Sequence, residues 1–206
     1  MTLAASATSG LDVSFSVISE PAILDGNVLT LTGLGTVTVR ASQAGNDAFN
    51  PATEVEQSFE VHRAFDNWLM AHFTEAELLE PAISGGGADP DMDGLPNDVE
   101  YALGLNPQAP SSLFTGDHSL SINEAGDSLV LRFSRNPDAF DATIAIEESF
   151  DLAFWTSVAT SVDGAAFQST QGYTVSESSG EGVLNVELIG LFTSPATRFQ
   201  RIIVVR

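Results

Sequence analysis

Hydrophobic and polar residues alternate over much of the first 62 positions of the chain. In the stretch LDVSFSV, from Leu11 to Val17, every second residue is apolar, which is the period of a half-buried β-strand. The stretches NVLTLTG, GTVTVRASQ and VEQSFEVH predict further strands. Within ILDGNVLTL, Asp25-Gly26 supplies the positive φ that a tight hairpin requires. We therefore expect an antiparallel β-domain over residues 1–63.

The period changes to that of helices from residue 64 to residue 108. Apolar residues of FDNWLMAHF recur at helical spacing, and TEAELLE begins with Thr74 and Glu77 in capping-box register. Pro81 is expected to end this helix, and the following triglycine, GGG at 85–87, is expected to be a flexible connector. A short helix, DVEYALG, then ends at Gly104. The pattern predicts a helical linker over 64–108.

The chain returns to strand patterns from residue 109 to residue 206. SLVLRFSR, ATIAIEES, GVLNVELIG and RFQRIIVVR are separated by clusters of Gly, Asp, Ser and Pro, and this spacing favours an antiparallel sandwich. The nearly continuous apolar run RIIVVR is typical of a strand buried on both faces. The predicted fold is thus mainly β, with two antiparallel β-sandwich-like domains, 1–63 and 109–206, joined by a short helical calcium-loop segment.

The stretch DPDMDGLPNDVE, residues 89–100, places oxygen-bearing side chains at the spacing of an EF-hand-like calcium loop. Calcium takes six to eight oxygen ligands at about 2.3–2.6 Å, and alternate aspartates followed by a glycine bend deliver them around one point. The predicted ligands are the side chains of Asp89, Asp91, Asp93, Asn97 and Glu100 and the main-chain carbonyl of Leu95, with Gly94 at the bend.

A second interpretation explains part of this stretch without a metal. Asn97, followed three residues later by Glu100, is also a helix-capping arrangement. A cap accounts for these two residues, but it does not account for three alternate aspartates, whose charges repel one another in an empty loop. The sequence therefore favours a metal site, and it favours Ca²⁺ over Mg²⁺ because all predicted ligands are protein oxygens.

The loop resembles the calcium loops of dockerins and of thrombospondin type 3 repeats over Asp89 to Leu105. Those families place an aspartate-rich loop before a helix in secreted and cell-surface proteins, so the resemblance implies such a location for this chain. It departs from a paired EF-hand, because Pro96 replaces an aliphatic residue and a triglycine precedes the loop. A dockerin carries two such loops and this chain carries one, so a structural calcium clip is expected in place of cohesin binding.

Two further resemblances come from the flanking stretches. SGLDVSFSV, LTGLGTVTVRASQAGN and FNPATEVEQSFEV resemble bacterial immunoglobulin-like repeats over residues 2–62, which implies an N-terminally incomplete domain whose first strands precede this chain. Together with FDNWLMAHFTEAEL, the loop, LRFSRNPDAFDATIAIEESFDLAFWTSV and RFQRIIVVR, this order resembles the C-terminal portions of large exported proteins of Verrucomicrobia-type bacteria. The resemblance implies an accessory region and assigns no activity.

The charge of the chain disfavours several classes of partner. Acidic residues number 28 against seven arginines and no lysine, and the net charge of -21 opposes binding to nucleic acids and to anionic membranes. No apolar run approaches the roughly 20 residues of a membrane-spanning helix. The start MTLAASATSG lacks the features of a signal peptide, so an export signal is expected upstream. The chain has no cysteine, which excludes disulfides and thiolate metal sites.

The sequence indicates a non-catalytic protein, because its three histidines are scattered and no nucleophile or metalloprotease motif is present. The first hypothesis is a structural, adhesion-type accessory region in which one calcium ion rigidifies the interdomain junction. The core expected there is Trp68, Leu69, Val99, Tyr101 and Leu103. The alternative is binding of a carbohydrate or another cell-surface ligand by the C-terminal sandwich. Its candidate aromatic residues are Phe154, Trp155, Phe167 and Tyr173, of which Trp155 is more typical of a core position.

Overall fold

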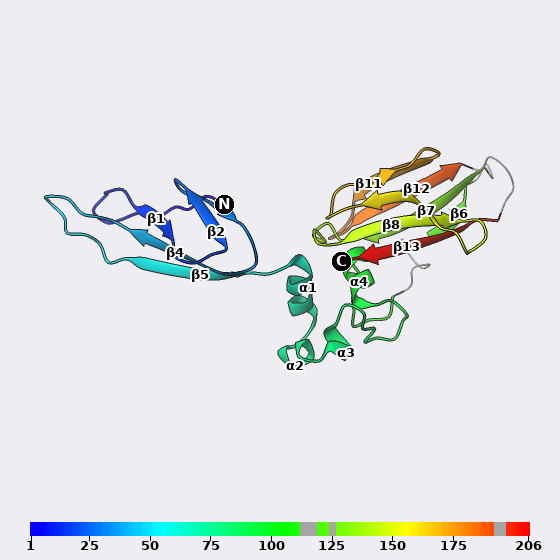
Figure 1. The fold of residues 1–206 in the computed structure, drawn as a ribbon, viewed down its shortest axis with the longest axis horizontal. Helices are drawn as coiled ribbons and strands as arrows, with labels where there is room; N and C mark the ends of the chain where they lie inside the picture. Colours follow the sequence, from blue (N-terminus) through cyan, green and yellow to red (C-terminus); the bar gives the residue numbers. More distant parts are fainter. Residues whose placement is uncertain (112–118, 124–126, 192–196) are drawn as a thin grey trace. The chain divides into compact units, whose positions relative to one another are not determined.

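The computed structural model describes residues 1–111, 119–123, 127–191 and 197–206. The chain divides into two compact units, Met1–Arg63 and Ala64–Arg206, here called unit 1 and unit 2. Antiparallel strands dominate both units (Figure 1), so the predicted mainly β fold is confirmed. Among the described residues, no helix is long and apolar enough to cross a bilayer.

Unit 1 contains a three-stranded sheet and a two-stranded hairpin. The sheet has the order β1-β4-β5, formed by β1 (Ser14–Val17), β4 (Gly35–Ser42) and β5 (Val55–Val61), and the hairpin consists of β2 (Ala22–Asp25) and β3 (Val28–Leu31). Asp25 pairs with Val28, so Gly26 and Asn27 form the turn, and Gly26 has a φ of 60°. A glycine at the first central position suits a two-residue hairpin turn. The predicted hairpin is confirmed, but its turn is Gly26-Asn27 and not the predicted Asp25-Gly26, because Asp25 still pairs as the last residue of β2.

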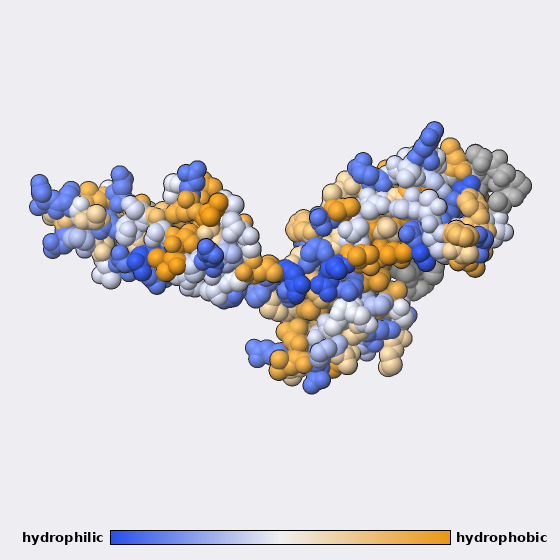
Figure 2. All heavy atoms as spheres, in the orientation of Figure 1, coloured by the Kyte–Doolittle hydropathy of each residue, from blue (hydrophilic) through white to orange (hydrophobic). Residues whose placement is uncertain are grey.

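The core of unit 1 is small. Its buried members are Ala22, Leu29, Val37 and Val39. Large apolar residues also remain on the surface, which Figure 2 shows as orange atoms among polar ones; they include Ile18, Ile23, Val28, Leu34, Phe49 and Val55. The outer edge of the sheet is β5, where exposed Glu56 and Glu60 are charges of the kind that discourages pairing with another strand.

Unit 2 begins with four short helices. They are α1 (Ala64–His72), α2 (Glu75–Leu78), α3 (Pro81–Ser84) and α4 (Asn97–Leu103). The predicted capping box is present, because Thr74 Oγ1 accepts the Glu77 backbone N–H at 3.4 Å and the Glu77 carboxylate accepts the Thr74 N–H at 2.8 Å. Pro81 not only follows the end of α2 but also occupies the first turn of α3, where its missing N–H has no cost.

The triglycine was expected to be a flexible connector, but two of its residues have a packing role. A Cβ atom on Gly85 would lie 2.4 Å from the Pro81 carbonyl oxygen, and one on Gly86 would lie 2.3 Å from the Asp98 carboxylate. The Gly86 carbonyl also accepts the backbone N–H of Asp98 at 2.8 Å. Gly85 thus fits the close approach of the chain to the first residue of α3, and Gly86 fits the close approach to the start of α4.

The strands of unit 2 form two four-stranded antiparallel sheets that fit the predicted sandwich. Their orders are β10-β9-β8-β13 and β11-β12-β7-β6. The strands are β6 (Ser119–Ile122), β7 (Ser128–Arg135), β8 (Thr143–Ser149), β9 (Thr156–Ser161), β10 (Gln168–Ser169), β11 (Tyr173–Ser179), β12 (Leu184–Leu191) and β13 (Phe199–Val205). Residues from both sheets, among them Phe133, Ile146, Val158 and Leu188, belong to one hydrophobic cluster.

The last strand differs from the prediction made from RIIVVR. β13 lies at the edge of its sheet, paired only with β8, and its residues are half-buried or exposed. Ile202 and Val204 pack against the core, whereas Val205 is 61% exposed. A continuous apolar run was thus a poor guide to burial, because an edge strand of a sandwich also carries apolar residues on its outer face.

The helices share the core of the sandwich. Phe65, Tyr101 and Leu103 are buried in the same cluster as the strands, and Trp68, Leu69 and Val99 pack against it. The aromatic rings are in direct contact, with the Tyr101 ring 5.1 Å from that of Phe65 and 5.6 Å from that of Trp68. The residues predicted to form a small core do pack together, but their cluster is part of the core of unit 2, whereas the prediction placed it at the junction of the two β-domains.

Gly104 ends α4 and allows a test of this packing. It has a φ of 73°, and an added Cβ would lie 2.7 Å from Val183 Cγ1. Gly182 has the same conformation, φ 74°, with open space around its missing side chain. We expect Gly104→Ala to destabilise unit 2 by about 2–3 kcal/mol, through both backbone strain and the clash, and Gly182→Ala by about 1 kcal/mol through strain alone.

Urea unfolding followed by tryptophan fluorescence measures this difference, because both tryptophans, Trp68 and Trp155, belong to unit 2. Equal losses of stability in the two variants would contradict the packing described at the end of α4.

Candidate metal centre

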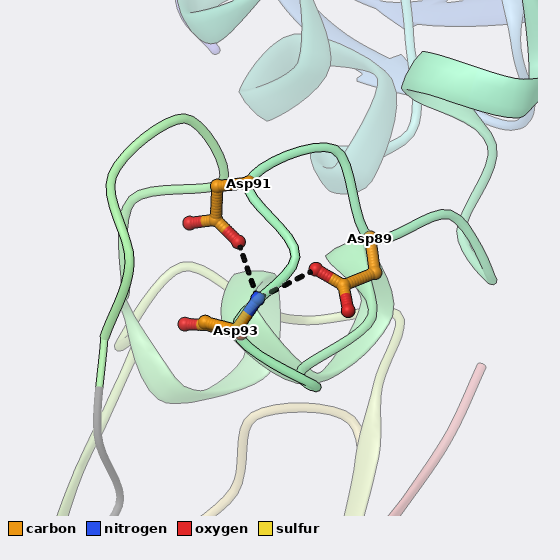
Figure 3. Close-up of side chains that lie close together, drawn as sticks. All are labelled: Asp89, Asp91 and Asp93. Carbon is orange, nitrogen blue, oxygen red and sulfur yellow. Dashed lines mark hydrogen bonds between the residues drawn. The ribbon is translucent and has the colours of Figure 1, made fainter.

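The loop between α3 and α4 folds around its own aspartates. Its backbone takes a positive φ at Met92 (60°) and at Gly94 (93°), which turns successive N–H groups toward the loop interior. The Asp93 N–H donates to Asp89 Oδ1 and to Asp91 Oδ1, both at 3.2 Å, as Figure 3 shows. The Gly94 N–H donates to Asp89 Oδ2 at 2.9 Å, and the Leu95 N–H to Asp93 Oδ1 at 2.8 Å.

Three carboxylates are brought together by this loop. One oxygen from each of Asp89, Asp91 and Asp93 lies within 4.8 Å of the others, and all three residues are half-buried. The backbone hydrogen bonds compensate part of the negative charge, but N–H groups carry only partial positive charge. The three aspartates therefore form a group that could hold a metal ion.

Glu100 is the residue that the loop itself does not explain. It lies in α4 and is fully buried. Neither of its carboxylate oxygens has a hydrogen-bond partner among the described residues, and the same is true of Asp91 Oδ2 and Asn97 Oδ1. A buried polar atom without a partner costs about 1–3 kcal/mol, and a charged one costs more. Four such oxygens in one short stretch leave room for a cation or for further hydrogen-bond donors.

The charges of the three aspartates act on Glu100. Burial, followed by the charges of Asp91, Asp93 and Asp89, raises the pKa of Glu100 to about 7. Burial also raises the pKa of Asp91, and the neighbouring charges of Asp93 and Asp89 act in the same direction. Without a cation, the ionised form of Glu100 is therefore disfavoured near neutral pH.

The helix-cap interpretation of Asn97 and Glu100 is wrong. No side-chain hydrogen bond caps α4 within the described chain, and its N-cap residue is Pro96. Asn97 Nδ2 instead donates to the carbonyl oxygens of Ile83 and Gly85, both at 2.9 Å. These two bonds join α4 to the end of α3 and fix the orientation of the amide. Its oxygen, Asn97 Oδ1, then has no hydrogen-bond partner among the described residues.

Other residues that fix the loop were not found from the sequence. The Ser111 N–H donates to Asp93 Oδ2 at 2.6 Å, and Arg206 Nε donates to Asp98 Oδ1 at 2.6 Å. The Arg206 guanidinium also lies over the Phe65 ring, 3.6 Å from its centroid. These contacts join residues between 18 and 141 positions apart, so no local sequence pattern encodes them. The one sequence feature that pointed to them was the acidic Asp98 in the first turn of α4.

A third anchor of α4 is Tyr101. The Tyr101 hydroxyl donates to Asp141 Oδ1 at 2.6 Å, and the Phe65 N–H donates to Asp141 Oδ2 at 3.4 Å. One carboxylate of the sandwich therefore holds both α4 and α1. Since Glu100 and Tyr101 are neighbours, the helix that carries the buried glutamate is fixed rigidly against the sheets.

The donor set fits a hard divalent cation. The group that could hold such an ion consists of Asp89, Asp91 and Asp93. Glu100 and Asn97 lie outside this group, and their buried oxygens lack partners among the described residues, so their role as ligands stays a prediction. Oxygen donors of this kind are those that calcium and magnesium prefer. The contribution of the Leu95 carbonyl stays a prediction.

Comparison with known proteins gives no match to a family model, to a curated protein or to a solved structure. The resemblances to calcium loops and to immunoglobulin-like repeats therefore stay predictions, and the geometry of the loop carries the functional argument.

The raised pKa of Glu100 predicts how ion-free stability depends on pH. The folded-state pKa of about 7 lies above the ordinary value of 4.5, so the folded protein retains a proton that the unfolded chain releases. Stability from this group is fully present below about pH 4.5 and is lost as the pH rises toward 7, by on the order of 3 kcal/mol. We expect wild type in chelator to lose stability relative to Glu100→Gln over this interval.

Urea unfolding at pH 5 and at pH 7, followed by tryptophan fluorescence, measures the free-energy difference between the two proteins. A difference that does not change with pH would show that Glu100 is not held in the buried, acidic environment described above.

Proposed function

We propose that residues 89–100 bind one Ca²⁺ ion that fixes the helical segment on the C-terminal sandwich, as a non-catalytic structural clip. The observation that carries the proposal is the fully buried Glu100, whose two oxygens have no partner among the described residues beside three aspartates. A divalent cation neutralises this group and restores a partner to each oxygen. Without such an ion, the described residues leave the buried charge uncompensated.

Calcium is preferred over magnesium for a structural reason. The loop offers several protein oxygens at once, from Asp89, Asp91, Asp93, Asn97 and Glu100. Calcium accepts six to eight such ligands in a flexible geometry, whereas magnesium retains several waters and binds to one or two carboxylates. A buried glutamate that closes the coordination shell is therefore better suited to calcium.

The ion would act mainly by changing the stability of α4. Ion-free, α4 carries a buried charge that favours its release; with calcium, the same helix gains an attachment in addition to Tyr101 and Leu103 in the core. Binding that is specific to the folded state stabilises it by about 2.7 kcal/mol at a concentration one hundred times the Kd. Unit 2 begins directly after Arg63 with α1, which Asp141 joins to α4. Fixing α4 would therefore also fix the start of unit 2, which is how the ion would rigidify the junction.

The same proposal gives the region its setting, that of an accessory part of a secreted or cell-surface protein. Extracellular calcium modules work with affinities of about 10⁻⁴–10⁻³ M, and a single loop whose three aspartates are only half-buried suits that range. The net charge of -21 is compatible with a surface-exposed, adhesion-type role and opposes nucleic-acid partners. This setting rests on the resemblances of the sequence and awaits its own test.

Replacement of Glu100 by glutamine tests the proposal directly. Glu100→Gln keeps the shape of the side chain and removes its charge, so we expect it to unfold at a higher temperature than wild type in chelator and at a lower temperature in calcium. Isothermal titration should show one site in wild type and an affinity reduced at least about a hundredfold in the variant.

Glu181→Gln is the matched control, because Glu181 is an exposed glutamate of the β11–β12 turn. It should behave as wild type in both conditions. Loss of stability in Glu100→Gln with and without calcium alike would mean that the carboxylate has a packing role only, and absence of calcium binding by wild type would contradict the proposal.

Hydrogen exchange tests the mechanical part of the proposal. On calcium removal we expect amides of residues 88–103 to exchange at least about tenfold faster, while β7, β8 and β12 keep their protection, because local opening requires less free energy than global unfolding. Equal acceleration in the loop and in these strands would contradict a local clip.

A further inference from the structure

A second candidate site lies in unit 2, between the ends of its two sheets. A cavity of about 490 Å³ is lined by residues of β8, β9, the β10–β11 turn, the start of β11, the end of β12 and the residue before β13. This is within the usual size range of small-molecule sites, about 300–1,000 Å³. None of its lining residues belongs to the metal loop.

An ion pair with little exposure forms the polar part of this cavity. Arg198 Nη1 donates to both carboxylate oxygens of Glu148, at 3.2 and 3.3 Å, and the exposed fractions of the two side chains are 11% and 5%. Tyr173 adjoins the pair, and burial, followed by a hydrogen bond with Glu148, raises its pKa. Its ring packs on Gly190, where a Cβ would lie 2.6 Å from Tyr173 Cε1. These charged and hydroxyl groups are thus held in fixed positions.

Exposed aromatic rings form the rim. Phe154 is 80% exposed and Phe150 is 58% exposed, and both line the cavity. Leaving two phenylalanines in water forfeits the gain that their burial provides. Single exposed apolar residues are common, but a pair beside a cavity with a fixed polar group is typical of a binding surface.

The rim is not a loose loop. Ser149 Oγ accepts the N–H groups of Asp151 at 3.3 Å and of Leu152 at 2.8 Å. Asp151 Oδ1 accepts the N–H groups of Ala153 and Phe154, both at 2.9 Å. Leu152 takes a φ of 63°, an uncommon conformation for leucine. The turn therefore holds Phe150 and Phe154 outward at the cost of backbone strain, a combination found at preorganised sites.

Of the four aromatic residues predicted as ligand-binding candidates, two line the cavity and two do not. Phe154 and Tyr173 line the cavity. Phe167 is buried in the core, edge-on to Phe133 with ring centroids 5.7 Å apart. The Trp155 ring is covered by the Arg201 guanidinium, 4.1 Å from its centroid. The binding alternative thus depends on two of the four residues, joined by Phe150.

The charges around the cavity select the class of ligand. An anionic ligand is disfavoured because Glu148 and Asp151 carry negative charge. A cationic ligand is disfavoured because Arg198 neutralises Glu148 and its guanidinium already lies 5.3 Å from the Phe150 ring centroid, where a cation would bind. A neutral ligand with apolar faces and hydroxyl edges is neither repelled by the carboxylates nor excluded by Arg198. An apolar face of such a ligand matches the exposed Phe154 ring, and its hydroxyls match the Glu148–Arg198 pair and Tyr173. We propose that this cavity binds a neutral carbohydrate, with Phe154 stacked on a sugar ring.

The test uses the whole chain in calcium, so that the metal clip is in place, and four neutral hexasaccharides: cellohexaose, xylohexaose, mannohexaose and maltohexaose. We expect titration calorimetry to detect at least one of them with a Kd below about 1 mM. Phe154→Ala should weaken that binding at least about tenfold, and Tyr173→Phe should weaken it by removing one hydroxyl.

Phe140→Ala is the matched control, because Phe140 is 61% exposed in the same unit and does not line the cavity. It should bind as wild type does, as should Glu100→Gln, which separates this site from the metal site. The thermal transition of each variant shows that it is folded.

Three results would overturn the proposal. They are no binding of any of the four saccharides, unchanged binding in Phe154→Ala, and preferential binding of an oligogalacturonate or of choline as the anionic and cationic probes. A dimer in sedimentation that Phe154→Ala dissociates would assign the aromatic rim to contact with a second copy, and would overturn it as well.

Discussion

The buried carboxylate of Glu100, placed beside three aspartates, is the constraint on which the helical part of this protein depends. Like charges at this separation repel, and burial strengthens the repulsion because little water screens it. The loop compensates partly by turning backbone N–H groups toward Asp89, Asp91 and Asp93. It provides nothing for Glu100 among the described residues. The backbone of the loop is therefore well hydrogen-bonded, whereas the charge of its carboxylates is only partly compensated, and this difference is the basis of the proposed cation site.

The surrounding packing explains why this charge is not simply expelled. α4 is fixed at Asn97 by two amide hydrogen bonds, at Tyr101 by Asp141 and at its end by the left-handed Gly104. Rotating Glu100 into water would require these contacts to break together. Hydrophobic packing thus supplies the free energy that keeps the unfavourable charge of Glu100 buried. A ligand that neutralised this charge would therefore stabilise the whole of α4.

Local patterns predicted the parts of the structure that depend on neighbours in the sequence. The capping box at Thr74, the Gly26 turn and the alternate aspartates each follow from spacing within a few residues. Contacts between distant segments were out of reach. Nothing in RIIVVR distinguishes an edge strand from a central one, and nothing near Asp98 names Arg206 as its partner. The roles of Gly85 and Gly86 likewise depend on which residues pack against them.

The ion pair between Asp98 and Arg206 has a consequence for the order of events during synthesis. It spans 108 positions and joins the start of α4 to the residue after β13. Asp98 is synthesised 108 residues before Arg206, so the acidic loop and the start of α4 first emerge without this ion pair. The attachment of α4 to the end of β13 is therefore complete only after both segments have been made, which makes the final position of this helix a late event in folding.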